Sequence, residues 1–242
     1  MDWRRAKNVL LLAFLVLNAV LGYQLWQEWQ ERLDMAVDWT SLPPETLRAI
    51  QEKGIRIEAS FPTETPVMRE ITYSLVNPPS AAGGAEIRIP LETPRESRIV
   101  INEKELRDAL GGVIPELDRY ALDPLGSTDG VFVLNRMEDG WPMFDVRLKL
   151  YSKDQKIVAY SQDRIKSLST DGSAGQKVLP AARAVAHLIE NDLPKGAVVK
   201  EIRLGYHGQF FDSETQVSAP SWRVLLEDGE VIYVNAISGE RM

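Results

Sequence analysis

The chain has 242 residues, which is enough for a membrane anchor plus one large or two small domains. Its 44% apolar and 26% charged residues are typical of a chain that buries a core, and its lack of cysteine excludes disulfides, cysteine nucleophiles and thiolate metal sites. The net charge of −7, with no basic run after Lys7, argues against a nucleic-acid partner, because phosphate binding needs clustered lysine and arginine.

The first expected element is a transmembrane helix at residues 8–25, behind a short tail at residues 1–7. As a helix, residues 9–25 would span roughly 25 Å, at the short end for a bilayer core. A cleaved signal peptide would need a small-x-small site, and the bulky, helix-favouring residues that follow offer none. A buried helix of a soluble protein would show a polar face, whereas residues 9–25 show only Asn18 and Gln24.

The charges that flank the span predict its orientation. Basic residues precede it and acidic residues follow it, so we expect the N-terminus in the cytoplasm and the C-terminal domain outside a single-pass cell membrane protein. Basic and aromatic side chains near the two ends are the expected anchors at the membrane interface: Trp3, Arg4, Arg5, Tyr23, Trp26 and Trp29.

One face of the span is a candidate contact with a partner helix. The amide of Asn18 needs a hydrogen-bond partner in hydrocarbon, and Gly22, one turn later, permits close backbone approach beside Ala19. The alternative is that the bilayer simply tolerates Asn18. Beyond the membrane, apolar residues at helical spacing predict a juxtamembrane helix at residues 26–40.

Residues 41–242 read as an extracytoplasmic domain. Expected helices are one that ends at Gly54, one at 102–110 and one at 179–191. Expected strands lie at residues 55–59, 71–76, 86–91, 131–137, 143–151, 157–161, 198–206, 221–226 and 231–236. Expected loops lie at residues 77–84, 123–130, 169–175 and 212–219, with hairpin turns at 138–140 and 228–229.

Few helices and many hairpin-joined strands predict an α+β fold, with helices packed on antiparallel sheets. We place a boundary between residues 151 and 152, which divides the domain into 41–151 and 152–242. The second half resembles a small PepSY-type module, because a helix is followed by a strand with a tryptophan, a glycine turn and a closing strand.

The sequence offers weak candidates for chemistry. The two histidines, His187 and His207, lack the spacing of a zinc site, although Glu190 lies three residues after His187. The acidic pairs at 138–139 and 227–228 are expected to form solvated turns, and Glu214 lies in a polar stretch. We therefore expect no catalytic, metal or cofactor-binding residues.

Two segments carry a family resemblance. The opening Met1-Asp2-Trp3, a basic residue, a short apolar span with Asn18 and then Tyr23-Gln24 resembles the start of the YycI (WalI) family, and the stretch at residues 176–182 is similar to a later part of it. Members are membrane-anchored accessory proteins of the WalK–WalR (YycG–YycF) two-component system of low-GC Gram-positive bacteria. The resemblance implies a YycH-type sister protein, contact with a WalK-type sensor histidine kinase, and no catalytic residues.

The function expected from these observations is non-catalytic regulation of a membrane sensor kinase that controls cell-wall homeostasis, through transmembrane and extracytoplasmic contacts. Two alternatives remain open at this point. One is a membrane-tethered cell-wall enzyme, which would need convergent carboxylates or histidines in a cleft. The other is a PepSY-like inhibitor or folding helper of an exported protein.

Overall fold

The computed structural model describes residues 14, 18, 42–76, 87–170, 174–208 and 213–242. These residues form mostly antiparallel strands with a few packed helices, which confirms the predicted α+β class for this part of the chain. The expected membrane span at residues 8–25 lies outside the described residues except for Phe14 and Asn18. Within the described ranges, no helix is both long and apolar enough to cross a bilayer.

The elements follow one another along the chain in this order: α2 (Pro44–Lys53), β1 (Arg56–Ile57), β2 (Val67–Met68), β3 (Ile71–Leu75), β4 (Ile89–Glu96), the 3-10 helix η2 (Ser97–Ile101), α3 (Glu103–Leu110), the 3-10 helix η3 (Leu117–Arg119), β5 (Tyr120–Thr128), β6 (Val131–Glu138), β7 (Trp141–Lys153), β8 (Lys156–Gln162), β9 (Ile165–Ser169), β10 (Gln176–Lys177), α4 (Ala181–His187), the π-helical turn η4 (Leu188–Asp192), β11 (Val198–His207), β12 (Gln216–Leu226) and β13 (Val231–Asn235).

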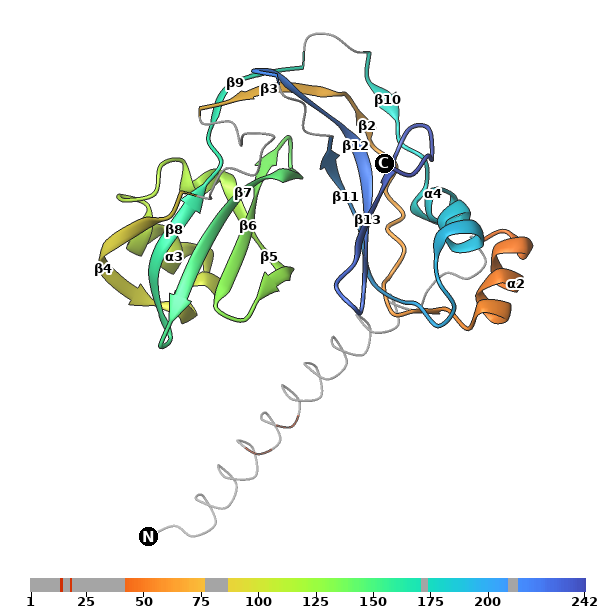
Figure 1. Cartoon of the computed structure of the whole chain (residues 1–242), viewed down its shortest axis with the longest axis horizontal. Helices are drawn as coiled ribbons and strands as arrows, with labels where there is room; N and C mark the ends of the chain where they lie inside the picture. Colours follow the sequence, from red (N-terminus) through yellow and green to blue (C-terminus); the bar gives the residue numbers. More distant parts are fainter. Residues whose placement is uncertain (1–13, 15–17, 19–41, 77–86, 171–173, 209–212) are drawn as a thin grey trace, which may run out of the picture.

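The molecule has two lobes (Figure 1). We call residues 89–162 the α3 lobe, which holds β4 to β8 with η2, α3 and η3, and residues 42–76 with 165–242 the α4 lobe. The α3 lobe is therefore inserted between β3 and β9 of the α4 lobe. The predicted boundary between residues 151 and 152 stays a prediction; that position lies within β7, close to its hairpin with β8.

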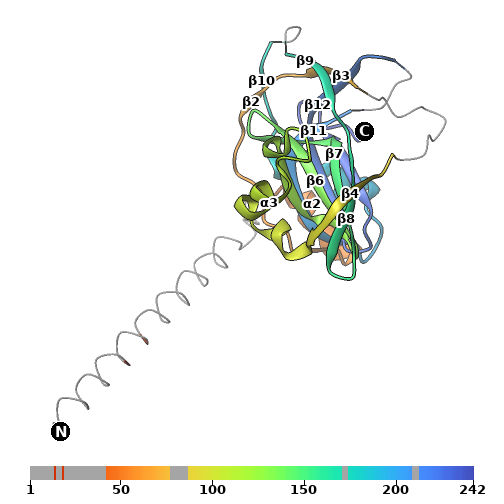
Figure 2. The ribbon, with the colours of Figure 1, turned by 90° about the vertical axis from the view of Figure 1, so that its left-hand side faces the viewer.

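Each lobe has its own hydrophobic cluster. In the α3 lobe, Leu106 and Leu110 of α3 pack with Leu134, Leu148 and Leu150 of the sheet. Figure 2 brings this lobe to the front and shows α3 beside the strands β6, β7 and β8. In the α4 lobe, the small side chains of α4 allow the helix to lie close to β12 and β13. The indole Nε1 of Trp222 donates to the Leu179 carbonyl (3.0 Å) and ties the start of this helix to the sheet.

The two lobes share one sheet with the strand order β4-β8-β7-β11-β12-β3-β9. Strands β7 and β11 join it in parallel through the pair Tyr206↔Met143. Strand β6 pairs with both β5 and β7, and β13 pairs with β12. Most strand pairs within each lobe are antiparallel. The lobes themselves meet at a narrow junction, where the one pair between β7 and β11 is parallel.

Local sequence signals explain the helix ends. Helix α2 stops at Gly54, whose φ of 65° is the left-handed conformation that glycine adopts at low cost, as predicted. Helix α3 starts behind Asn102, whose side chain accepts hydrogen bonds from the amides of Lys104 and Glu105. The ammonium of Lys53 donates to three carbonyls around η4 and so fixes α2 against the end of the α4 helix.

Two sequence predictions are wrong. The expected loop at residues 123–130 is largely strand β5, which extends to Thr128 and pairs with β6. The expected loop at 212–219 contains the first residues of β12, because Gln216–Ser218 pair with β3. A strand that was not predicted, β9, precedes the loop expected at residues 169–175. In the two mispredicted segments, pairing with β6 and with β3 overrides local turn-forming residues.

The junction between the lobes predicts a sensitive glycine. A Cβ added at Gly205 of β11 would lie 2.5 Å from the Pro142 carbonyl oxygen and 2.6 Å from the Phe144 ring. We expect Gly205→Ala to lower the free energy of unfolding by about 1–3 kcal/mol, because a backbone carbonyl and a buried ring cannot both move away.

Urea denaturation would measure this change. Gly112→Ala is the matched control, since a Cβ there meets nothing within 4 Å; we expect it to change stability by less than about 0.5 kcal/mol. Equal stability of the two variants would show that the junction is not tightly packed at Gly205.

Candidate functional site

The most unusual chemical feature of the described residues is a buried ion pair between the lobes. Arg223 of β12 and Asp123 of β5 expose 5% and 1% of their side chains. Both terminal nitrogens of the guanidinium donate to the carboxylate, Nη1 to Oδ2 and Nη2 to Oδ1 (3.0 Å). This two-pronged geometry is the strongest form of a charged hydrogen bond.

The remaining polar atoms of the pair also have partners. The Asn135 amide (2.9 Å) and the Gly126 N–H (3.1 Å) donate to Asp123. Burial tends to raise the pKa of Asp123, but the hydrogen bonds and charge of Arg223 outweigh it, so the pKa lies below its ordinary value. The carboxylate is therefore charged at neutral pH.

Arg223 is held on three sides. Its Nε donates to Glu201 Oε2 (3.0 Å), and its guanidinium carbon lies 4.7 Å from the centre of the Phe144 ring. Burial favours the neutral form, but the hydrogen bonds and charges of Asp123 and Glu201 prevail and raise the pKa of Arg223. The hydrogen bonds of this cluster hold β5 of one lobe to β12 of the other.

A second polar contact crosses the same junction. His207 at the end of β11 lies with Nδ1 2.8 Å from Asp145 Oδ1 of β7, and the other carboxylate oxygen accepts from the Gly208 N–H (2.8 Å). The imidazole stacks on the Tyr233 ring, with centres 3.5 Å apart. His207 therefore serves as a contact between strands in this structure.

The other candidates for chemistry do not converge. His187 contacts Asn191, whereas Glu190 accepts from the Thr46 hydroxyl, so these two residues face different partners. Within the described ranges, no group of three or more histidine, aspartate or glutamate residues is placed to hold a metal ion.

The acidic turn residues have structural contacts as well. Glu138 lies 3.8 Å from Arg119, and Asp139 has a left-handed φ of 51° at the turn between β6 and β7. Glu227 lies 3.1 Å from Lys200. The Asp228 carboxylate accepts from the Glu230 N–H. Glu214 is exposed at the start of the segment that leads into β12.

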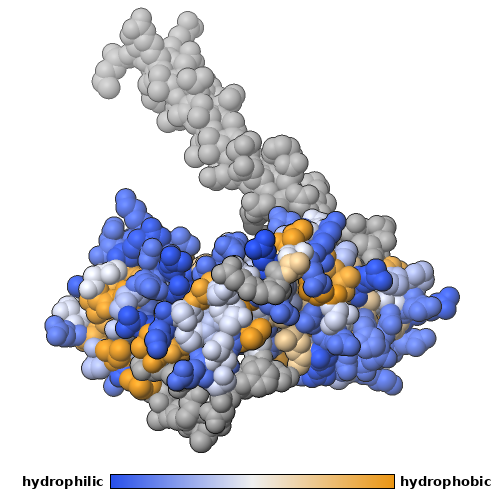
Figure 3. All heavy atoms as spheres, turned by 90° about the horizontal axis from the view of Figure 1, so that it is seen from above, coloured by the Kyte–Doolittle hydropathy of each residue, from blue (hydrophilic) through white to orange (hydrophobic). Residues whose placement is uncertain are grey.

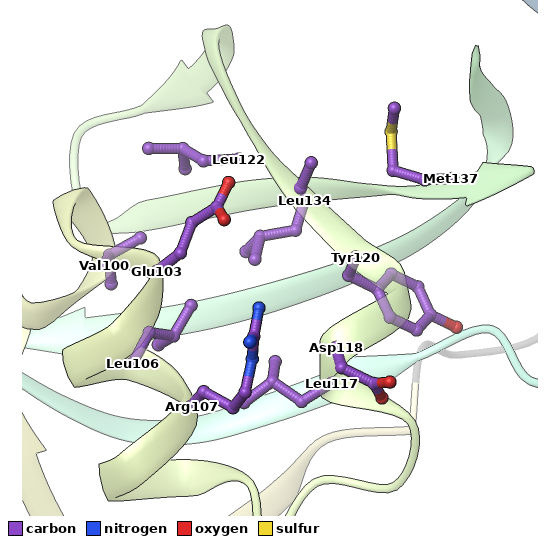
Figure 4. Close-up of a pocket in the computed structure, with 11 residues that line it drawn as sticks. Val100, Glu103, Leu106, Arg107, Leu117, Asp118, Tyr120, Leu122, Leu134 and Met137 are labelled. Carbon is purple, nitrogen blue, oxygen red and sulfur yellow. The ribbon is translucent and has the colours of Figure 1, made fainter. Parts of the chain in front are cut away.

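The α3 lobe also contains a pocket of about 270 Å³ (Figure 4). It lies between α3, η3 and the strands β5 and β6. Aliphatic side chains form its floor, and Glu103, Arg107 and Asp118 bring charges to its rim. Seen from above, the surface is mostly hydrophilic and carries several hydrophobic patches (Figure 3). The pocket itself is a partly apolar hollow with charged residues among its lining.

The predicted membrane residues lie almost entirely outside the described part of the chain. Asn18 is described, and its Nδ2 donates to the Phe14 carbonyl one turn earlier (2.9 Å). The other predicted contacts and anchors lie outside the described residues: Trp3, Arg4, Arg5, Ala19, Gly22, Tyr23, Trp26 and Trp29.

Sequence reasoning missed Asp123 and Arg223. A weak signal was present, because Arg223 interrupts the apolar run of β12 between Trp222 and Val224. A charge within a buried strand needs a buried partner. No local pattern identifies that partner, which lies 100 residues away.

The buried pair leads to a prediction about acid stability. Asp123→Asn keeps the shape but removes one charge, and we expect it to lower the free energy of unfolding at pH 7 by about 3 kcal/mol, as for other broken buried pairs. Since the folded pKa of Asp123 is depressed, its stabilisation is complete above the unfolded value of about 3.9 and is lost as pH falls through the folded value.

The stability difference between wild type and Asp123→Asn should therefore narrow below about pH 4. Urea unfolding at several pH values checks this. The control is Asp108→Asn, because Asp108 is exposed. A difference that stays constant down to pH 3 would contradict the assignment of Asp123 as the acid-sensitive group.

Comparisons with known proteins place the chain in a family. Among curated proteins, none matches. A crystal structure of an uncharacterized protein from Eubacterium rectale aligns with a TM-score of 0.32 and 14% identity, over 46% of this chain and 41% of that one. The family model described as YycI protein matches residues 80–237. This match confirms the resemblance seen in the sequence, and because it covers more than half of the chain, the protein belongs to the YycI family.

Proposed function

We propose that this protein is a non-catalytic accessory regulator of a WalK-type sensor histidine kinase. The observation that carries the proposal is the YycI family match over residues 80–237, which supports a role linked to the WalK (YycG) system. The buried charges at the lobe junction fit this role, because their hydrogen bonds fix structure and expose no reactive group.

The proposed arrangement places the chain in the cell membrane. Residues 8–25 would cross the bilayer once, with residues 1–7 in the cytoplasm and residues 41–242 outside. A YycH-type sister protein would bind the extracytoplasmic domain. Regulation would pass through contacts with the kinase.

The mechanism rests on differential binding. A regulatory subunit shifts a kinase between two states only if it binds one state more tightly than the other. The proposed membrane contact uses the face of Asn18, Ala19 and Gly22. In the structure one N–H of the Asn18 amide is satisfied by the Phe14 carbonyl; the second N–H and the amide oxygen would remain for a partner helix.

The orientation can be tested with reporters. A reporter that is active only outside the membrane, fused after Met242, should be active, because the positive flank precedes the span. The same fusion to a reporter that works only in the cytoplasm is the control and should be silent. The reverse pattern would refute the proposed topology.

The membrane contact predicts that a few residues of the span matter more than the rest. Gly22→Leu should weaken co-purification with the kinase by blocking close approach, and Asn18→Leu should weaken it several-fold by removing a hydrogen bond of about 1 kcal/mol. Leu17→Ala is the matched control, because at 3.6 residues per turn Leu17 lies on the other side of the helix from Ala19 and Gly22. Co-purification from detergent and transcription from genes controlled by the two-component system measure the effect.

Replacement of residues 8–25 by an unrelated apolar helix separates a specific contact from a simple tether. Loss of kinase association by the chimera would support the membrane contact. Wild-type association and output would show that regulation comes from the domain at residues 41–242.

A further inference from the structure

Strand β5 forms an open edge of the α3 lobe. Its ladder to β6 is regular from Tyr120 to Asp123 and becomes irregular before Thr128. Among the described residues, no strand pairs with β5 on its other side. An open strand edge presents backbone N–H and C=O groups to any extended chain that approaches.

Alternation along the strand shows which residues offer these groups. The Ser127 hydroxyl accepts from the Val133 N–H (2.9 Å) and donates to the Asp123 carbonyl (2.7 Å), so the backbone of Asp123 faces β6. Its neighbour Leu122 must then direct its backbone N–H and C=O to the outer edge. Pro124 has no N–H and limits the open edge to the first half of the strand.

The pocket lies directly beside this edge. Leu122 and Tyr120 of β5 line it together with Leu134 of β6 and Leu106 of α3 (Figure 4). By the alternation along the strand, Tyr120 and Leu122 are also the residues whose backbone N–H and C=O groups point away from β6. A strand added along β5 would therefore place its alternate side chains over the same face of the sheet, where the pocket is open.

The rim of the pocket indicates the charge of the occupant. Glu103 at the start of α3 and Asp118 in η3 contribute two carboxylates, and Arg107 contributes one guanidinium. The rim is thus net negative. A segment that carries a lysine or arginine next to its aliphatic residues is electrostatically complementary to it, and an acidic segment is not.

We propose that the outer edge of β5 and the adjoining pocket bind an extended segment of another protein by strand addition. The segment has aliphatic side chains at alternate positions, one of which fills the pocket, and a basic side chain at the rim. Backbone hydrogen bonds to Leu122 provide the strand pairing, and the volume of about 270 Å³ selects the side chain. This surface is separate from the proposed membrane contact.

The test uses the purified full-length chain in mild detergent and a short fluorescent peptide in which leucine and lysine alternate. Fluorescence anisotropy should show saturable binding. A peptide of the same sequence with N-methyl groups on the leucine amides keeps its side chains but cannot donate to the sheet edge. We expect this peptide to bind at least tenfold more weakly, and a scrambled peptide to bind weakly as well.

Substitutions then place the peptide on the protein. Glu103→Lys at the rim should weaken binding several-fold, whereas Asp108→Lys, an equal charge change at an exposed position of the same helix, should leave it unchanged. Circular dichroism checks that both variants fold. The comparison of the unmodified and the N-methylated peptide uses the wild-type protein and requires no variant.

Three results would overturn the proposal: no saturable binding, equal binding of the N-methylated peptide, or equal effects of the two lysine substitutions. A dimer of the chain whose β5 edges can be crosslinked to each other would also overturn it, because a second copy would then be the occupant.

Discussion

The structure depends on one buried charge pair. Removing a guanidinium and a carboxylate from water is costly, and the cost is offset only when every donor and acceptor is satisfied. Arg223 and Asp123 meet this condition with help from Glu201, Asn135 and the Gly126 amide. Because the two charges belong to different lobes, their hydrogen bonds define the angle and the distance at which the lobes meet. Apolar packing alone would tolerate sliding at a junction joined by a single parallel pair of residues.

The same constraint explains the character of the junction. Strand β11 approaches β7 closely at Gly205, where the Phe144 ring fills the space that a side chain would take. That ring also lies under the Arg223 guanidinium. The polar contact of His207 with Asp145 closes the other end of the interface. Together these contacts hold the two lobes at one orientation relative to each other.

Helix ends and turns that depend on the residues beside them could be predicted from the sequence. The helix end at Gly54 and the turn at Asp139-Gly140 follow from the conformations these residues favour, and the structure confirms them. The helix predicted at residues 102–110 is α3, with Asn102 as its N-cap. Pro124 and Gly126 favour a loop after Asp123, and the polar residues at the start of β12 favour one there. Pairing with β6 and β3 decides these segments. The pairing of charges separated by 100 residues lies beyond any local pattern.

The insertion of one lobe into the other has a consequence for synthesis. The α3 lobe is contiguous, so all of its strands can pair as soon as residue 162 has emerged. Strand β1 must wait for β11, because Arg56 pairs with Val198, and β3 needs the residues of β12 around Val217. Helix α2 also waits for η4. Strand β1 and helix α2 thus lack these partners until most of the chain is made, whereas β3 can pair with β9 and β2 with β10 earlier. Loop closure over such separations is slow and leaves strand edges exposed, so the inserted lobe is the natural first unit to fold and the last segment of the chain completes the molecule.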